Sequence, residues 1–241
     1  MLSETEAYGV NIHQAPTNET ASLYHTVDAG TTWTRSFLPA DFLNNVFAAQ
    51  SGNIWSSGYN GAVLHKAGAS STLQLVSAVS RKSHNAAGTF EISLPLTGTP
   101  GVECRDGGGS YSFVFNFTTS VVSGSASVTA GTGTIGTPTF SGTTMTVPLT
   151  GVTDVQTLTI TLTGVTDASS QVLPATPVSA NMLIGDVNGD KKVNNTDVSV
   201  TRGRVGMAVT SENFREDVRI SGTITTADAR AVQGAKGHRL P

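Results

Sequence analysis

The stretch Thr157-Leu158-Thr159-Ile160-Thr161-Leu162-Thr163 alternates polar β-branched and apolar residues without a break. A period of two places the apolar side chains on one face of a β-strand and the threonines on the other. A helix repeats every 3.6 residues and cannot separate this pattern into two faces. The stretch therefore predicts a β-strand with one face in a core and the other in water.

Strands of the same kind are predicted on both sides of this stretch. Apolar residues recur with a period of two in residues 111–117 and 145–149, and turn residues such as Ser141-Gly142 separate the runs. Shorter runs lie at 90–94, 125–128 and 178–182. The total is about seven or eight strands at the intervals of a β-sandwich. We therefore expect residues 71–184 to form a sandwich of the immunoglobulin-like or carbohydrate-binding-module-like type.

The composition favours a β-rich protein of the extracellular type. The chain has 241 residues, of which 38% are apolar, so it can bury ordinary cores. Only 13% are charged, and Gly, Ser and Thr are abundant. The net charge of -3 comes without a basic stripe, so nucleic acid is not an expected ligand.

Cysteine content and the first residues bear on the cellular compartment. Cys104 is the only cysteine, which excludes an internal disulfide and a cysteine-based zinc cluster and favours a small buried residue over a nucleophile. The start, Met1-Leu2-Ser3-Glu4-Thr5-Glu6, is acidic where a signal peptide is basic. No apolar run approaches the length of a transmembrane helix, so we expect no membrane span. We expect a secreted or cell-surface protein whose export signal lies upstream in a longer polypeptide.

The first zone, residues 1–70, carries both tryptophans and one turn motif, Thr26-Val27-Asp28-Ala29-Gly30-Thr31-Thr32-Trp33. In such a hairpin turn the Asp28 carboxylate accepts backbone N–H groups, Gly30 permits a positive φ, and Trp33 packs beneath the turn. The motif resembles the Asp-box of sialidase-type β-propellers. This resemblance implies about one or one and a half propeller blades. A β-meander unrelated to propellers is the alternative.

An oxygen-rich loop opens the last zone, residues 185–241. With Asp186 as loop position 1, side-chain oxygens fall at positions 1, 3, 5, 9 and 12, and position 7 offers a backbone carbonyl. Ca²⁺ takes about six to eight oxygen ligands, which alternate residues of a tight loop can direct to one centre. The candidate ligands of this first site are Asp186, Asn188, Asp190, Lys192 through its carbonyl, Asn194 and Asp197. An Asp- and Asn-rich surface turn without a metal is the alternative.

Two positions of this loop depart from an ordinary EF-hand. Position 6, normally Gly, is Lys191, which requires a left-handed φ at a modest cost. Position 12, normally Glu, is Asp197. Val193, at position 8, is expected to anchor this loop to a partner loop.

A second copy of the loop follows 31 residues later, from Asp217 to Asp228. The shift aligns Asp186 with Asp217, Asp197 with Asp228, and Val193 with Ile224, which indicates an internal repeat. Arg219 and Ser221 stand at positions 3 and 5 of the second copy, where a cation needs oxygen ligands. The ligands left for a weak or empty second site are Asp217, Thr223 through its carbonyl, Thr225 and Asp228. We expect Arg219 to replace the ion by pairing with one of the two aspartates.

The repeated loops resemble a type I dockerin or dockerin-like domain, in which EF-hand-like loops bind Ca²⁺ and a helix face docks on a cohesin. The position 12 aspartate is typical of that family, and the pattern of residues 71–184 resembles the β-domains that precede dockerins in bacterial secreted proteins. The fold class implied is mainly β, with a small all-α calcium-binding domain at residues 185–241. The resemblance places the partner-binding residues at Asn195, Thr196, Arg202, Arg204 and Thr226. A solvated helix face is the alternative for the two arginines.

Motifs of catalysis are missing from the sequence. The five histidines have no metal-binding spacing, and no nucleophile elbow, phosphate loop or dinucleotide fingerprint is present. We predict a non-enzymatic, modular protein that binds calcium and attaches to a cohesin-type partner. A polysaccharide-binding or polysaccharide-degrading role for the parent protein is one alternative, and a purely structural surface protein is another.

Overall fold

The fold is taken from a computed structural model of the chain, which describes residues 7–10, 22–37, 43–48, 54–58, 63–66 and 72–241. The chain divides into two compact units, Met1–Ser71 and Thr72–Pro241. Strands dominate the described residues of both units, so the prediction of a mainly β protein is confirmed. The predicted boundary between residues 184 and 185 lies inside the second unit.

The described part of the first unit contains two three-stranded antiparallel sheets. The first consists of β1 (Ala7–Val10), β2 (Ser22–Thr26) and β3 (Thr34–Phe37), in that order. The second consists of β4 (Leu43–Ala48), β5 (Ile54–Gly58) and β6 (Val63–Lys66). That residues 1–70 belong to a β-propeller stays a prediction. Residues 1–6, 11–21, 38–42, 49–53, 59–62 and 67–70 of this range lie outside the described residues.

The turn between β2 and β3 has the predicted hydrogen bonds. One oxygen of Asp28 accepts from the backbone N–H of Thr32 at 2.8 Å and from the hydroxyl of Thr26 at 2.7 Å. Gly30 has a φ of 87°, and the Trp33 indole N–H donates to the Gly30 carbonyl at 3.1 Å. The Thr32 hydroxyl donates to the other oxygen of Asp28 at 2.6 Å, and this bond, with those from the Thr32 N–H and the Thr26 hydroxyl, lowers the pKa of the Asp28 carboxyl to about 2. The turn prediction is confirmed, although Trp33 is 47% exposed.

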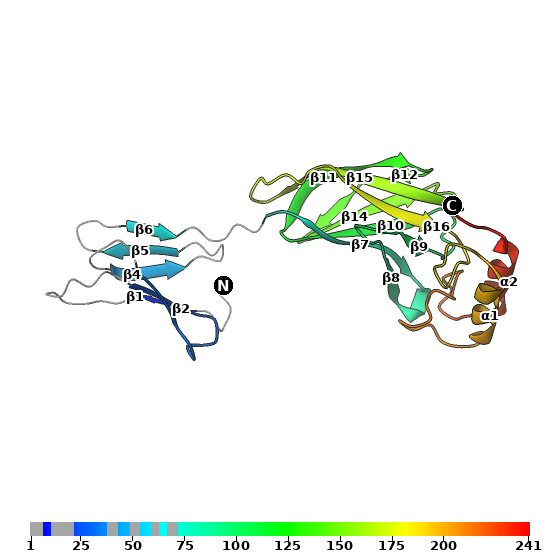
Figure 1. The fold of residues 1–241 in the computed structure, drawn as a ribbon, viewed down its shortest axis with the longest axis horizontal. Coiled ribbons are helices and arrows are strands. Elements are labelled where there is room, and N and C mark those ends of the chain that lie inside the picture. Colours follow the sequence, from blue (N-terminus) through cyan, green and yellow to red (C-terminus); the bar gives the residue numbers. More distant parts are fainter. Residues whose placement is uncertain (1–6, 11–21, 38–42, 49–53, 59–62, 67–71) are drawn as a thin grey trace. The chain divides into compact units, whose positions relative to one another are not determined.

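The second unit contains two sheets (Figure 1). In the first, the order is β12-β14-β10-β7-β8, and β13 also pairs with β14. In the second, the order is β11-β15-β16-β9, and only the β16–β9 pair is parallel. The strands of the first sheet are β7 (Leu75–Ser83), β8 (Thr89–Ser93), β10 (Tyr111–Phe117), β12 (Thr134–Ile135), β13 (Thr139–Ser141) and β14 (Thr144–Thr150). Those of the second are β9 (Gly101–Glu103), β11 (Val121–Ala130), β15 (Gln156–Asp167) and β16 (Thr176–Met182).

One hydrophobic core joins the two sheets. Phe113 of β10 and Val147 of β14 belong to the same buried cluster as Leu158 and Ile160 of β15. The β15 threonines such as Thr157 and Thr163 are exposed on the other face, as the alternating pattern predicts. The strands predicted from the three alternating runs are confirmed.

The C-terminal segment adds two short helices, α1 (Asn195–Gly203) and α2 (Thr226–Ala235), which pack against each other. Figure 1 shows them together at one end of the two sheets. A second buried cluster contains Val193, Val198 and Val232 from this segment and Val102 from β9. Residues 185–241 therefore share a core with the β-strands that precede them. None of the helices in the described residues is long and apolar enough to cross a membrane.

Candidate metal loops

The first loop folds around the buried Asp186 carboxylate. One of its oxygens accepts from the N–H groups of Gly189 at 2.8 Å and Asp190 at 3.1 Å, and the other accepts from Lys191 at 2.8 Å. Lys191 has a φ of 69°, which confirms the left-handed conformation predicted at position 6. The carboxylate thereby accepts hydrogen bonds from three backbone N–H groups that would otherwise lack a partner in this turn.

The aspartate at position 12, Asp197, closes the loop. Its two oxygens accept from the backbone N–H of Asn188 at 3.3 Å and of Asn194 at 2.9 Å. Asn194 also caps α1 by accepting from Thr196, so positions 9 and 12 form a capping box. Asn194 and Asp197, at positions 9 and 12, therefore stabilise the loop and the start of α1 through these hydrogen bonds.

The charges of the first loop favour a cation. Burial, and then repulsion by Asp197 and Asp190, raise the pKa of the Asp186 carboxyl. No ion pair to Asp186, Asp190 or Asp197 occurs among the described residues. Three carboxylates with amide and carbonyl oxygens are a donor set that fits Ca²⁺.

The side chains of the first loop do not converge on one centre. Within the described residues, no three His, Cys, Asp or Glu side chains are grouped as metal ligands. Asn188 donates from its amide to Asp190 at 3.2 Å, and Asp190 in turn accepts from the N–H of Lys192 at 3.0 Å. Calcium binding therefore requires these side chains to turn toward a common point.

The second loop repeats the backbone arrangement of the first. Asp217 accepts from the N–H groups of Ser221 and Gly222, both at 2.8 Å. Asp228 accepts from the N–H groups of Arg219 at 2.9 Å and Thr225 at 2.8 Å. Each of these bonds matches one in the first loop after a shift of 31 residues. The internal repeat predicted from sequence is present in the hydrogen bonds as well.

Hydroxyl groups already pair the oxygens of the second loop. The Ser221 hydroxyl lies 3.2 Å from Asp217 and donates to the Thr223 carbonyl at 2.8 Å. The Thr225 hydroxyl donates to Asp228 at 2.7 Å. The oxygens of the predicted second site, on Asp217, Thr223 and Asp228, therefore already accept hydrogen bonds from hydroxyl groups of the same loop.

A side-chain partner for Asp217 of the second loop comes from the β-sheets. His84, which follows β7, places its Nδ1 2.8 Å from the Asp217 carboxylate, and both side chains are fully buried. Arg219 forms no ion pair with either aspartate in the part of the chain that the structure describes. The expectation that Arg219 replaces the ion is therefore wrong. Arg219 is exposed, whereas His84 lies against the loop.

A buried ion pair continues inward from His84. The His84 Nε2 lies 3.4 Å from the Arg105 guanidinium, which donates to both oxygens of Glu103 at 2.8 and 2.7 Å. The same guanidinium donates to the carbonyls of Phe90 at 3.0 Å and Ser80 at 2.9 Å. Burial raises the pKa of Glu103, but the hydrogen bonds and charge of Arg105 outweigh burial and leave that pKa below 4.5. Arg105 and Glu103 are both fully buried.

The two halves of the C-terminal segment complete each other's loops. Val193 donates to the carbonyl of His238 at 2.9 Å, and Ile224 donates to the carbonyl of Met207 at 3.2 Å. Isolated bridges pair Lys192 with Arg239 and Ala208 with Thr223 in the same reciprocal manner. The backbone of Val193 therefore pairs with the segment after α2, and not with Ile224 as a partner loop would require.

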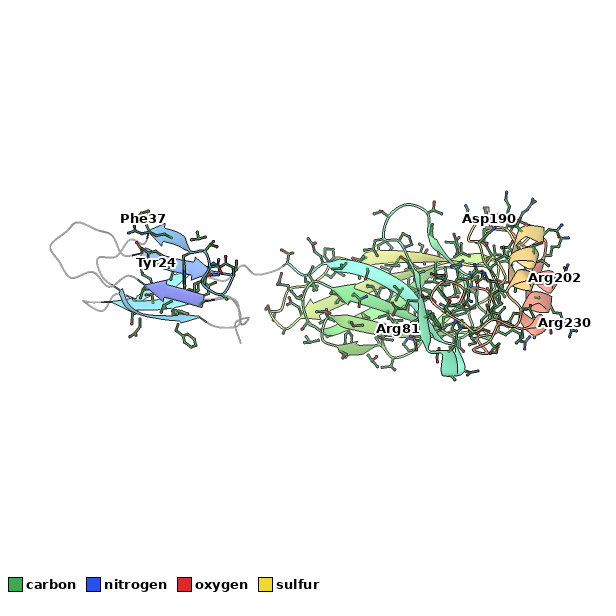
Figure 2. The ribbon with its side chains drawn as sticks, turned by 90° about the horizontal axis from the view of Figure 1, so that it is seen from below. Tyr24, Phe37, Arg81, Asp190, Arg202 and Arg230 are labelled. Atoms are coloured by element: carbon green, nitrogen blue, oxygen red, sulfur yellow. The ribbon has the colours of Figure 1, made fainter. Side chains whose placement is uncertain are left out.

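The predicted partner-binding residues lie at the helix ends. Asn195, Thr196 and Thr226 are exposed at the helix starts. Arg202 is exposed on α1 and donates to Gln233 of α2 at 3.4 Å. Figure 2 shows Arg202 and Arg230 on the outer side of α1 and α2. Arg204 is half-buried, 3.5 Å from Glu216, so it is less available to a partner.

A pocket of about 410 Å³ adjoins the first loop. Its walls include Asn188 and Gly189 of the loop, Glu91 of β8, Phe214 and Arg215. Arg215 donates to the carbonyls of Val187 at 2.7 Å and Asp186 at 3.1 Å and so holds the start of the loop.

Cys104 is buried, which confirms the interpretation of a small core residue, and burial raises its pKa to about 11.

No sequence signal pointed to His84 or Arg105. His84 lies 133 residues from Asp217, and an isolated histidine carries no information about such a distant contact. Glu103 and Arg105 lie two residues apart at the end of a strand, and this spacing does not tell whether their side chains face the core or the solvent.

Searches of protein families, curated proteins and solved structures found no match to this chain.

Proposed function

We propose that the chain is the calcium-binding, attachment part of a modular secreted or cell-surface protein. In this proposal residues 185–241 are a dockerin-like module whose first loop binds one Ca²⁺. The two sheets of residues 72–184 are an immunoglobulin-like or carbohydrate-binding-module-like sandwich that carries the module. The chain itself has no enzymatic role.

One observation carries the proposal: the first loop combines the EF-hand ligand spacing with three aspartates that lack any cationic partner in the described residues. Without a cation these negative charges repel each other, and burial makes the repulsion more costly. A bound Ca²⁺ offsets both the repulsion between the carboxylates and the cost of burying their charge. The exposed residues Asn195, Thr196 and Arg202 beside this loop supply a surface for a cohesin-type partner.

Calcium titration of the full chain by calorimetry tests the metal claim. We expect about one ion to bind with a Kd of about 1 mM or lower. Asp190→Ala, at position 5 of the first loop, should abolish binding because it removes one of three carboxylates. Ser221→Ala, at the equivalent position of the second loop, is the matched control and should leave the Kd unchanged. Absence of binding to the unmodified chain at millimolar Ca²⁺ would refute the proposal.

Binding to a purified cohesin domain, measured with Ca²⁺ and with a chelator, tests the partner claim. We expect binding only with Ca²⁺, and we expect Arg202→Glu to weaken it, because the guanidinium is exposed on α1. Arg81→Glu on β7 is the control for a general charge effect. Equal binding with and without Ca²⁺ would contradict the proposed mode of attachment.

An aromatic row in the first unit favours a second candidate, polysaccharide binding. Register places Phe47, Trp55 and His65 opposite one another across β4, β5 and β6, and Phe47 and Trp55 are 67% and 45% exposed. Trp55 and His65 stack with ring centroids 3.9 Å apart. Exposed aromatic side chains in a row are typical of ligand-binding surfaces.

Electrophoresis of the chain in gels that contain neutral polysaccharides tests this candidate. A polysaccharide ligand slows migration of the unmodified chain, and Trp55→Ala should restore the migration seen without polysaccharide. Val63→Ala, which removes an exposed apolar side chain from the same sheet, should still be retarded. Equal retardation of both variants would argue against a role for the row.

A further inference from the structure

We propose that the second loop, residues 217–228, is a docking loop for the β-sheets of the same chain, in which an N–H group of His84 holds Asp217, the carboxylate at position 1. The occupant of the loop is thus a segment of the protein itself, the turn that follows β7. This inference concerns the second loop alone. It rests on the proposed calcium binding of the first loop only where the two loops are compared.

The His84 ring has one arrangement of protons that satisfies both neighbours. A guanidinium only donates hydrogen bonds, so the ring nitrogen facing Arg105 accepts. The proton then sits on Nδ1, which donates to the Asp217 carboxylate at 2.8 Å. The carboxylate at position 1, the first ligand of an EF-hand loop, is therefore held by a side-chain donor.

Backbone contacts fix the rest of the docking surface. The Asp106 N–H donates to the Val218 carbonyl at 2.7 Å, and the Asn85 side chain donates to the Ser221 carbonyl at 3.1 Å. At Gly222, which has a φ of 89°, an added Cβ would lie 2.7 Å from the His84 carbonyl. The turn and the loop therefore approach too closely for any side chain at this position.

The side chain of Phe214 extends the contact. It stacks on Phe90 of β8 with ring centroids 5.2 Å apart and an interplanar angle of 6°. The His84 ring meets Phe90 edge-on at 5.2 Å and Phe214 edge-on at 6.2 Å. Hydrogen bonds and aromatic packing together make an interface with His84 and Asp217 fully buried and the two Phe rings half-buried, which a flexible tether between independent domains would lack.

The two loops should therefore respond differently to calcium. In the second loop the position 1 carboxylate accepts from a side-chain donor of the sheets, and Ser221 and Thr225 supply protons to the other ligand oxygens. That loop is complete without an ion. Among the described residues, the carboxylates of the first loop accept only from amide N–H groups of the loop itself, and no side chain from outside the loop donates to them.

Amide hydrogen exchange of the full chain, followed by NMR in a chelator and then in excess Ca²⁺, tests the inference. With the chelator we expect the amides of Ser221 and Gly222 to be protected, because the docked loop needs no ion. Added Ca²⁺ should change exchange rates in residues 186–197 and leave those two amides within about twofold. Fast exchange of both amides in the chelator, or a large gain of protection on adding Ca²⁺, would overturn the inference.

Two variants at position 84 extend the test. His84→Ala should speed exchange of the Ser221 and Gly222 amides at least tenfold, because Asp217 loses its buried donor. His84→Gln should restore most of the protection, because its amide can donate to Asp217 and accept from Arg105. If His84→Ala does not fold, protection in His84→Gln decides: loss of protection there overturns the inference.

The outcomes separate this inference from the proposed function. If Ca²⁺ changes neither loop while Ser221 and Gly222 stay protected, calcium binding by the first loop fails and the docking loop stands. If the unmodified chain binds two ions and Asp217→Asn removes one of them, the docking loop fails and calcium binding stands.

Discussion

Replacement of Arg105 by Met should be among the most damaging single changes in the second unit. Methionine fills a similar volume but removes the guanidinium that donates to both oxygens of Glu103 and to the carbonyls of Phe90 and Ser80. The Glu103 carboxylate would then remain fully buried without a cation. Removing one partner of a buried ion pair typically costs about 3–5 kcal/mol, so we expect a loss of this size in the free energy of unfolding.

The assay is urea denaturation of the full chain followed by far-UV circular dichroism. Both tryptophans, Trp33 and Trp55, lie in the first unit, so tryptophan fluorescence reports that unit separately. Arg105→Met should lower the midpoint of the second unit and leave the fluorescence transition in place. The unchanged fluorescence transition is the internal control for protein quality.

A double-variant cycle separates the ion pair from other effects of the substitution. Glu103→Gln combined with Arg105→Met leaves no buried charge from this pair. We expect the double variant to lose clearly less than the sum of the two single losses. A loss below about 1 kcal/mol for Arg105→Met, or additive losses in the double variant, would refute the reasoning.

Three further predictions follow from the structure. Because the folded pKa of Glu103 lies below 4.5, its contribution to stability is present above about pH 4.5 and is lost as the pH falls through the folded pKa; the urea midpoint of the second unit should fall on acidification, and less steeply in Glu103→Gln. Deletion of residues 237–241 removes the backbone bonds to Val193 and Lys191, so circular dichroism should show a lower thermal midpoint and calorimetry a weaker response to Ca²⁺. Asp28→Ala removes the acceptor of the β2–β3 turn and should lower only the fluorescence transition.

Sequence patterns correctly predicted the elements that depend only on residues close together in the chain. Alternation predicted β15 because Leu158 and Ile160 must share a face, whatever they pack against. Loop spacing predicted the turn at Lys191 because a six-residue turn around one carboxylate requires a left-handed residue there. The strand order, with β9 parallel to β16, depends on long-range pairing that no local pattern encodes.

The partner of the second loop was beyond sequence reasoning for a related cause. Position 3 of that loop is Arg219, and a positively charged residue within the loop is the first candidate to replace a bound ion. The backbone of Arg219 serves Asp228 instead, and its side chain is exposed. His84 reaches Asp217 only because the sheets bring the turn after β7 against the loop.

The reciprocal pairing makes the two halves of the C-terminal segment depend on each other. Each loop receives its backbone bonds at position 8 from the segment that follows the other helix, through His238 for Val193 and Met207 for Ile224. A single loop–helix unit could make these bonds only with a second copy of itself. The geometry is that of two equivalent loop–helix units related by an approximate twofold and joined in one polypeptide, in which one loop is acidic and the other faces the sheets.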